Sequence, residues 1–408
     1  MIVKKTRIAV LYDRLGPYHL ARMKALSRRV DLTAVEFSAR DETYAWDLVK
    51  DSGAYRRVTL FSDKPIGLHQ SAVVSARVKS VLSELKPHVV IIPGWDAPAA
   101  LVALQWCLES GTPSVLLSDS QETDQKRVWW KELLKGRIVR LHLAGFVGGA
   151  PHVAYLVSLG MPETRICSGC DVVDNDYFAA GAEAARKDET RRERLGLPNA
   201  YFLASGRFVE KKNLPLMLYA YADYLRQAGT SAWSLVLIGD GPMKSQLLQL
   251  RQELRLEKKV IFPGFKQYAE IPSYYGLAGA FVHTSSSEQW GLVINEAMAC
   301  GLPVIVSSPC GCVPDLIRHG YNGLVFNPCD QGELTRSMVH LSSNECNRTE
   351  MGAAGQANIS EFSLESFADN LCRAADKALT AKRARFNLLD KIILHRVIHR
   401  SKQIESEG

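Results

Sequence analysis

Short apolar runs alternate with helix-spaced apolar residues through the first half of the chain. The runs that predict strands are residues 7–12, 32–37, 89–92 and 114–117. The segments that predict helices are 18–29, 69–85, 98–109 and 125–140. Unbroken apolar strands are typical of a sheet covered on both faces, and their alternation with helices predicts βαβ units in a parallel sheet.

The same alternation restarts near residue 200. The predicted strands are 200–205, 234–238, 260–263, 280–283 and 303–307, and the predicted helices are 214–227, 243–254 and 292–299. One core rarely extends beyond about 250–300 residues, and the chain has 408. Two Rossmann-like domains are therefore expected. The charge-rich stretch 186–194 and Gly196-Leu197-Pro198 predict a linker between residues 174 and 197.

The last segment has a different pattern. Residues 362–379 predict one helix, and 380–408 form a basic amphipathic tail in which apolar residues cluster among Lys and Arg. Such a tail is typical either of an interfacial helix on anionic lipid or of a solvated helix packed on the protein body, and the pattern leaves both open.

Composition narrows the functional classes. The formal net charge of +7 is mild for this length, which suits an anionic substrate or membrane surface and does not indicate nucleic-acid binding. The first residues lack the long apolar region of a secretory signal, and no stretch has the roughly 18 consecutive apolar residues of a membrane span. We therefore expect a cytoplasmic protein.

The nine cysteines agree with that expectation, because they are scattered and odd in number. Cys310-x-Cys312, with Cys300 nearby, lacks a partner at zinc spacing. We interpret these cysteines as buried or loop thiols and expect no metal site.

The segment 204–214 carries the first candidate chemistry. It leaves a strand, turns at Gly206 and enters a helix, at the sheet edge where ligands bind in such folds. Arg207 and Lys212 can bind phosphate there, and fixed cations stabilise the negative charge that builds on a departing phosphate. A solvated charged loop is the alternative for this segment alone.

The second candidate segment runs from Glu288 to Pro303. A polar loop leads into a helix near Gly291, whose free N–H groups and positive dipole end suit a diphosphate. Glu288 and Glu296 would repel phosphate but can accept hydrogen bonds from sugar and ribose hydroxyls. The alternative is that Glu288 caps the helix and Glu296 is solvated.

These segments together resemble the Glu-x7-Glu region of retaining glycosyltransferases of family 4, which have the GT-B fold. Further landmarks follow in the order of that family, and the match is strong from about residue 200 to 326. They are Gly206-Arg207 with Lys212-Asn213, Ile238-Gly239-Asp240-Gly241-Pro242, Gly264-Phe265, Pro309-Cys310-Gly311-Cys312-Val313-Pro314-Asp315 and Gly320-Tyr321-Asn322-Gly323-Leu324.

The resemblance implies a role for each matching position. Arg207 and Lys212, beside Gly206, would hold the donor diphosphate, Glu288 the donor sugar and Glu296 the ribose. The remaining positions implied near the donor are Gly16, Gly239, Gly241, Phe265, Lys266, Gly291, Leu292 and Val293. It also implies an N-terminal acceptor domain at 1–178, a donor domain at 179–361, a helix 362–379 crossing back to the first domain, and the tail 380–408.

Several positions depart from the family pattern. Thr284-Ser285 replaces Pro-Ser, and Gly311-Cys312-Val313-Pro314-Asp315 replaces Gly-Gly-x-x-Glu. Many relatives carry a His near the reacting carbon, where this chain has Asp119. Asp96 and His19 are further candidates, and the alternatives are an Asx turn or helix cap for the acids and an ordinary first-turn residue for the histidine.

The resemblance implies a metal-independent transferase that moves a sugar from a nucleotide-sugar, such as a UDP- or GDP-sugar, to a hydroxyl of a saccharide or lipid-linked acceptor. The anomeric configuration would be retained, in cell-envelope or exopolysaccharide synthesis. Either the leaving phosphate deprotonates the acceptor or a double displacement occurs. An epimerase or phosphorylase on the same fold, and a non-catalytic sugar-nucleotide-binding protein, are the alternatives.

Overall fold

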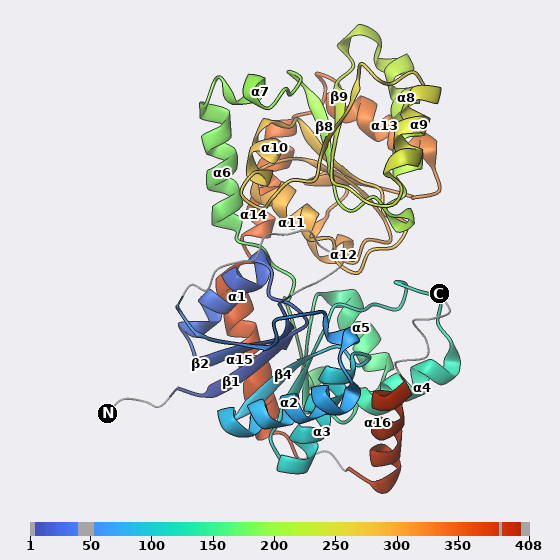
Figure 1. Cartoon of the computed structure of the whole chain (residues 1–408). Helices are drawn as coiled ribbons and strands as arrows, with labels where there is room; N and C mark the ends of the chain where they lie inside the picture. Colours follow the sequence, from blue (N-terminus) through green and yellow to red (C-terminus); the bar gives the residue numbers. More distant parts are fainter. Residues whose placement is uncertain (1–4, 40–52, 383–385, 401–408) are drawn as a thin grey trace. The chain divides into compact units, whose positions relative to one another are not determined.

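The computed structural model describes residues 5–39, 53–382 and 386–400, and the chain is drawn in Figure 1. It divides into two compact units. The N-terminal unit takes its residues from 1–122, 126–172 and 364–408, and the C-terminal unit from 123–125 and 173–363. Residues 1–4, which belong to the segment considered as a secretory signal, lie outside the described residues.

A seven-stranded parallel sheet forms the centre of the N-terminal unit, in the order β3-β2-β1-β4-β5-β6-β7. The strands are β1 Arg7–Tyr12, β2 Asp31–Ser38, β3 Arg56–Phe61, β4 Val89–Pro93, β5 Ser114–Ser118, β6 Ala144–Val147 and β7 Ile166–Ser168. The four predicted strands are confirmed as β1, β2, β4 and β5. The sequence pattern did not reveal β3, β6 or β7.

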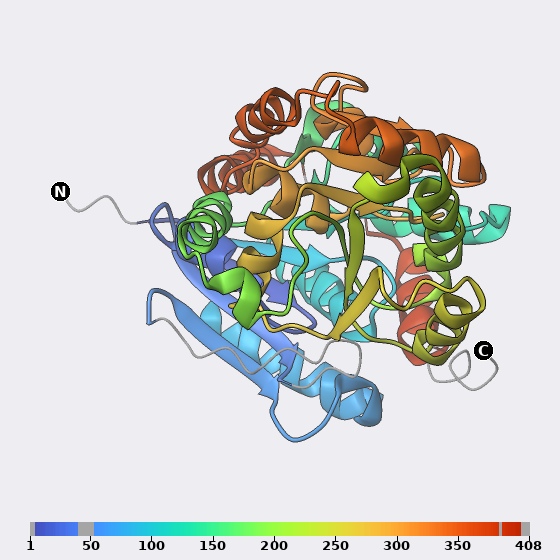
Figure 2. The same cartoon turned by 90° about the horizontal axis from the view of Figure 1, so that it is seen from above.

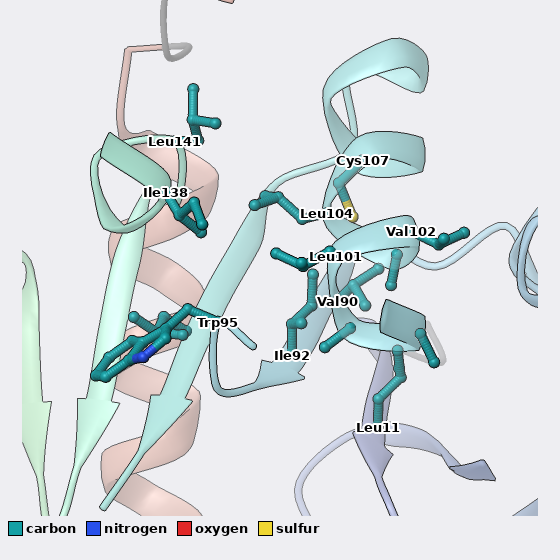
Figure 3. Packing of buried hydrophobic residues seen from close by; sticks show 14 of the residues in the cluster. Leu11, Val90, Ile92, Trp95, Leu101, Val102, Leu104, Cys107, Ile138 and Leu141 are labelled. Atoms are coloured by element: carbon teal, nitrogen blue, oxygen red, sulfur yellow. The ribbon is translucent and has the colours of Figure 1, made fainter. Parts of the chain in front are cut away.

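Helices cover both faces of this sheet. They are α1 Pro17–Ser27, α2 Ser71–Leu85, α3 Pro98–Ser110, α4 Trp129–Val139, α5 Ala150–Ser158, α15 Leu364–Thr380 and α16 Leu388–Arg400, with short 3-10 turns at Ile66–Leu68 and Glu163–Arg165. The main core lies between the sheet and α3, where Val90 and Ile92 of β4 meet Leu101 and Leu104 (Figure 3). Helix α15 packs with α1 and the sheet, and Phe367 contacts Phe146 there.

The basic tail forms α16, which packs against α3. Leu394 and Ile398 are buried in the core at helical spacing, together with Asp390, whose carboxylate accepts from Arg137 Nε at 2.7 Å. One of the two interpretations of the tail, a helix packed on the body, therefore holds for residues 388–398. Residues 383–385 and 401–408 of the tail lie outside the described residues. None of the described helices is both long and apolar enough to cross a membrane.

The C-terminal unit has a second parallel sheet, of six strands in the order β10-β9-β8-β11-β12-β13. The strands are β8 Tyr201–Ser205, β9 Ser234–Ile238, β10 Val260–Gly264, β11 Ala280–His283, β12 Val304–Ser307 and β13 Gly323–Phe326. Five of these were predicted within a residue or two. The unit therefore has the doubly wound architecture expected of a Rossmann-like domain.

Helices α8 and α9 lie on one face of this sheet, and α6 and α10 on the other (Figures 1 and 2). The helices are α6 Asn175–Lys187, α7 Arg191–Arg194, α8 Leu214–Ala228, α9 Lys244–Glu253, α10 Ile271–Leu277, α11 Leu292–Ala299, α12 Val313–Leu316, α13 Gln331–Ser342 and α14 Arg348–Ile359. Short 3-10 turns occur at Glu210–Lys212 and Gly229–Ser231.

The prediction of a linker between residues 174 and 197 is wrong, because this stretch forms α6 and α7. Asp174 caps α6 by accepting from the N–H of Tyr177 at 3.0 Å. Small side chains then allow α6 to lie directly against α10. A Cβ at Gly276 would come within 2.5 Å of the carbonyl oxygen of Ala182. This close packing replaces the expected flexible connection.

Candidate active site

The candidate site of the C-terminal unit lies where the strand order of its sheet reverses. The chain runs outward from β8 through β9 to β10, then returns to place β11 on the other side of β8. Such a switch point opens a crevice at the carboxyl ends of the two central strands. A pocket occupies this position and is lined by Ser205, Gly206, Arg207, Lys212 and His283, among others.

Two cations reach this crevice from the loop after β8. Lys212 ends a 3-10 turn, and Asn213 follows in the left-handed region with φ 51° before α8 begins. Arg207 is exposed, and its guanidinium has no hydrogen-bond or ion-pair partner among the described residues. Arg207 is thus accessible at the switch point, and Lys212 lies largely buried beside it.

The glycines after β9 have a packing role that the sequence did not indicate. A Cβ at Gly239 would lie 1.9 Å from the carbonyl oxygen of Gly206, and one at Gly241 would lie 2.6 Å from that of Phe208. Both glycines have positive φ, 142° and 156°. They allow the loop after β9 to press against the loop that carries Arg207, and so help to hold that loop in place.

Glu288 is the centre of a compact polar cluster. Its carboxylate pairs with Lys212 Nζ, accepts from Ser285 Oγ at 3.1 Å, and lies 3.2 Å from His283 Nε2. Lys211 Nζ is more distant, at 4.0 Å from Oε1. The N-cap of α11 is Gly291, so the interpretation of Glu288 as the helix cap is wrong. The cluster joins the ends of β8 and β11.

Electrostatics keep this cluster charged. Burial alone would raise the pKa of Glu288, but the hydrogen bond from His283 and the charge of Lys212 outweigh it and hold the pKa well below its usual range. Burial also lowers the pKa of His283, yet its hydrogen bonds with Cys310 and Glu288 raise it overall. Glu288 is therefore an acceptor only and cannot serve as a general acid near neutral pH.

Glu296 has a different environment. It lies buried on α11, where Tyr275 donates to Oε2 at 2.7 Å. Gly291 begins that helix with φ 103°, and Leu292 and Val293 form its first turn, where N–H groups lack helical acceptors. The alternative of a solvated Glu296 is wrong, because α11 packs between the sheet and α14.

The thiols of Cys310 and Cys312 lie beneath this loop. Their sulfurs are 3.6 Å apart, and Cys310 Sγ donates to the carbonyl oxygen of Trp290 at 2.9 Å. A Cβ at Gly291 would be 2.7 Å from Cys310 Sγ. The same Cβ would be 3.7 Å from Cys312 Sγ. Cys312, which stands where the family pattern has glycine, therefore also packs under the start of α11. At the sheet edge, Phe265 follows β10 directly, and Lys266 pairs with Glu270 at 3.6 Å.

The N-terminal unit has its own switch point, between β1 and β4. Gly16 follows β1 and donates its N–H to His19 Nδ1 at 3.1 Å, which closes the first turn of α1. Burial, aided by the charge of Arg22, lowers the pKa of His19 to about 3. His19 is therefore neutral at physiological pH and keeps its Nε2–H as a donor.

The two acidic candidates follow the neighbouring strands. Asp96 lies after β4 and Asp119 after β5, and both are exposed at the carboxyl edge of the N-terminal sheet. Gly16 and His19 therefore follow β1, and Asp96 follows the neighbouring strand β4, so all three lie at the switch point of this sheet. Asp119 follows β5, one strand further along.

Three residues that contact Glu288 or Glu296 were missed from the sequence: His283, Ser285 and Tyr275. His283 ends β11 and was assigned only to a strand, although a His at a strand end five residues before Glu288 was a usable signal. No local signal pointed to Tyr275, because it reaches Glu296 from another helix.

Comparisons with known proteins agree with this geometry. Residues 186–358, within the C-terminal unit, match the family described as glycosyl transferases group 1. Over 169 residues the chain is 28% identical to alpha-monoglucosyldiacylglycerol synthase of Acholeplasma laidlawii, covering 41% of each chain. Over 200 residues it is 29% identical to amylovoran biosynthesis glycosyltransferase AmsK of Erwinia amylovora, covering 48% of each. The chain thus spans less than half the length of these relatives.

Solved structures extend the likeness to both units. HepE from Anabaena, solved in complex with UDP, gives a TM-score of 0.71 at 19% identity and covers 91% of this chain and 100% of its own. Sucrose-phosphate synthase from Thermosynechococcus elongatus gives 0.70 at 17% identity, with coverages of 91% and 99%. At such identities the likeness shows the fold alone, and it confirms the predicted pair of Rossmann-like domains of the GT-B fold.

Proposed function

We propose, from the match of residues 186–358 to the group 1 glycosyl transferases, that the chain transfers a sugar from a nucleotide-sugar to an acceptor hydroxyl with retention of configuration. The observation that carries the proposal is the cluster at the β8–β11 switch point. There Lys212, Glu288 and His283 form a charged, largely buried group, with Arg207 exposed beside it.

This arrangement suits departure of a nucleoside diphosphate. Charge builds on the leaving phosphate oxygen in the transition state, and preorganised cations stabilise it most where water is scarce. Arg207 can bind the diphosphate through its planar fork, and Lys212 adds a compact charge. When a diphosphate binds, Lys212 is shared between the phosphate and Glu288. The N–H groups at the start of α11 supply further donors.

The two carboxylates have separate roles in this proposal. Glu288 stays ionised and is held by its partners, so it accepts hydrogen bonds from the donor sugar and does not act as an acid. The departing phosphate then takes the acceptor proton. Glu296, oriented by Tyr275, accepts from the ribose hydroxyls. Gly239, Gly241, Phe265 and Lys266 belong to the loops that surround the nucleotide.

The N-terminal unit would bind the acceptor. His19 offers a neutral N–H donor near Gly16, which suits an uncharged hydroxyl group. Asp119 is exposed at the same sheet edge and can accept a hydrogen bond from the acceptor. The domains proposed for this division of labour are 1–178 for the acceptor and 179–361 for the donor, with 362–379 returning to the first domain and the tail at 380–408.

We further propose that the acceptor is a saccharide or a lipid-linked saccharide of the cell envelope, reached at the inner face of a membrane. The names of the two relatives support this, one as a diacylglycerol glycoside synthase and the other in amylovoran biosynthesis. All nine cysteines are free thiols, which suits a reducing compartment. On α16, Lys391, His395 and Arg396 are exposed and add positive charge to the surface of the N-terminal unit.

A thermal-shift screen of UDP-, GDP- and ADP-sugars tests the donor proposal, since a ligand that binds the native state raises its apparent stability by mass action. We expect one nucleotide class to raise Tm, and Arg207→Ala to weaken that response. If no nucleotide-sugar raises Tm at millimolar concentration, the donor site is wrongly assigned.

A product assay separates transfer from the two alternatives. With the donor identified, release of the nucleoside diphosphate should depend on an added acceptor, and NMR of the product should show the donor's anomeric configuration. An epimerase would rearrange the donor without acceptor, and a phosphorylase would require inorganic phosphate. A binding protein would release nothing under any of these conditions.

A further inference from the structure

Helix α4 lies at the outer edge of the N-terminal unit (Figure 1). Several large apolar side chains of this helix are exposed. Trp129 is 75% exposed, Trp130 48% and Leu133 62%. Their spacing places them on one side of the first helical turns. Single exposed apolar residues are ordinary, but a contiguous group with two tryptophans marks an interaction surface. We call Trp129, Trp130 and Leu133 the α4 face.

The opposite side of α4 is firmly attached to the unit, so the helix cannot rotate to hide these residues. Ile138 and Val139 are buried in the core. Glu132 accepts from Tyr155 OH at 2.7 Å and from Lys135 Nζ at 2.9 Å. Because these contacts fix which side of α4 points inward, exposure of the α4 face is built into the fold.

The segment around the α4 face is basic on balance, although Arg137 is paired with Asp390 of α16. Residues 126–140 contain six Lys or Arg and one acid, Glu132, whose charge is already offset by Lys135. Lys126 and Lys131 are exposed beside the tryptophans. Glu122 and Asp124 precede this stretch and are the nearest acids in sequence. Tryptophan between lysines is the composition found at the interface of a bilayer.

A hollow opens beside Leu133, between α4 and α5. Arg127, Arg140, Tyr155 and Ser158 line it, along with Glu122 and Glu132. The guanidinium of Arg127 stacks on the Tyr155 ring at 4.3 Å from its centroid. Arg127 is held by carbonyl oxygens of Gln121 and Glu122. Arg140 is exposed at the same hollow and is suited to the phosphate of a lipid headgroup, whose acyl chains would lie against the tryptophans.

We propose that the α4 face docks on an anionic bilayer, with the two tryptophans and Leu133 in the interfacial region and Lys126 and Lys131 against lipid phosphates. The proposal concerns α4 and not the α16 tail, and it does not rest on the transferase activity. A membrane is favoured over a protein partner because the exposed Lys126 and Lys131 flank the apolar side chains, and their charge complements an anionic surface.

Vesicle sedimentation of the full chain tests this without any sugar donor. We expect binding to vesicles of phosphatidylcholine with phosphatidylglycerol, weak binding to phosphatidylcholine alone, and weakening by salt. The triple variant Trp129→Ser/Trp130→Ser/Leu133→Ser should lose at least about tenfold in partitioning. Leu68→Ser is the matched control, because Leu68 is 63% exposed on the same unit, and it should bind like the unchanged chain.

Two further measurements distinguish docking through α4 from docking through α16 and from self-association. Vesicles should shift the tryptophan emission of the unchanged chain to shorter wavelength, and Trp129→Tyr/Trp130→Tyr should remove that shift. The variant Leu388→Ser/Leu389→Ser, on α16, should bind normally. The proposal is overturned if the unchanged chain ignores anionic vesicles, if Leu68→Ser fails equally, or if only the α16 variant fails. It is also overturned if the triple variant merely abolishes self-association in light scattering.

Discussion

Replacing Lys212 by alanine tests the leaving-group assignment most directly. The variant removes a cation that the fold holds in the crevice, and losing one preorganised group that stabilises developing charge typically costs a factor of about 100 to 1,000 in kcat. We therefore expect kcat at saturating donor to fall by about 100-fold or more, which corresponds to about 2.7 kcal/mol or more of transition-state stabilisation.

The same change should also destabilise the protein, by an amount that the structure bounds. The side chains of Lys212 and Glu288 are only 15% and 12% exposed, so their pairing is not a surface ion pair. However, Glu288 keeps Ser285 and His283 as partners after the change. We expect a loss of about 1–3 kcal/mol, below the cost of a fully stranded charge. Thermal melts should show it as a Tm lower by several degrees.

Lys211 provides the matched control. It adjoins Lys212 but is half-exposed, with Nζ 4.0 Å from the nearer Glu288 oxygen. Lys211→Ala should change stability by less than about 1 kcal/mol and turnover by less than about threefold. Nucleoside diphosphate release and circular dichroism measure both. If Lys212→Ala keeps a third of its turnover while folded, or if Lys211→Ala loses as much, the assignment of Lys212 fails.

Three other outcomes follow from the same site. Gly239→Ala should lower the free energy of unfolding by about 2 kcal/mol or more, because its Cβ would lie 1.9 Å from the Gly206 oxygen. Gly264 is the control, since it also has a positive φ but has open space around its Cβ position. Gly264→Ala should lower the free energy of unfolding by only about 1–2 kcal/mol, and thermal melts measure both variants. Stability should depend on pH in two directions. The depressed pKa of Glu288 contributes stability above its unfolded value of about 4.3 that is lost as pH falls through the folded pKa. The raised pKa of His283 contributes stability below about 6.5 that is lost as pH rises through its folded pKa, so urea unfolding of His283→Asn should lack that alkaline decline. Finally, EDTA should leave transfer unchanged, since Arg207 and Lys212 supply the positive charge, and restoration by Mg²⁺ after a loss would contradict this.

Much of the C-terminal unit could be predicted because its central strands are unbroken apolar runs of the length typical of strands. The missed strands β3 and β6 lie in the sheet of the N-terminal unit. β3, at one edge of that sheet, carries Arg56, Arg57 and Thr59 at positions that are not buried, and β6, an inner strand, has only four residues including Gly145. The region of α6 looked like a linker because its outward charges mask the inner face of Phe178, Ala182 and Ala185. Helix α6 is held in place by its packing against Gly276 of α10, almost a hundred residues further along the chain. No local sequence pattern could indicate that contact.

The candidate site was likewise predictable only in part. Sequence motifs keep some of its residues at fixed spacing, and these could be identified: Arg207, Lys212, Glu288 and Glu296. Their partners could not, since Tyr275 meets Glu296 only after two helices pack. The roles of Gly239 and Gly241 also needed the fold, because the contact that requires glycine is with a neighbouring loop.

The sequence offers more candidate residues for the proposed donor site than for the proposed acceptor site, and the reason is physical. A diphosphate carries charge, so its site needs cations and bare N–H groups at set places, and those leave traces in sequence. A neutral hydroxyl needs only a few correctly aimed polar atoms. His19 illustrates this, because its useful property is a proton kept on Nε2 by the Gly16 N–H and by burial. Such a property belongs to the folded environment and not to a motif, so identifying the acceptor requires binding measurements on the N-terminal unit's own residues, beginning with His19 and Asp119.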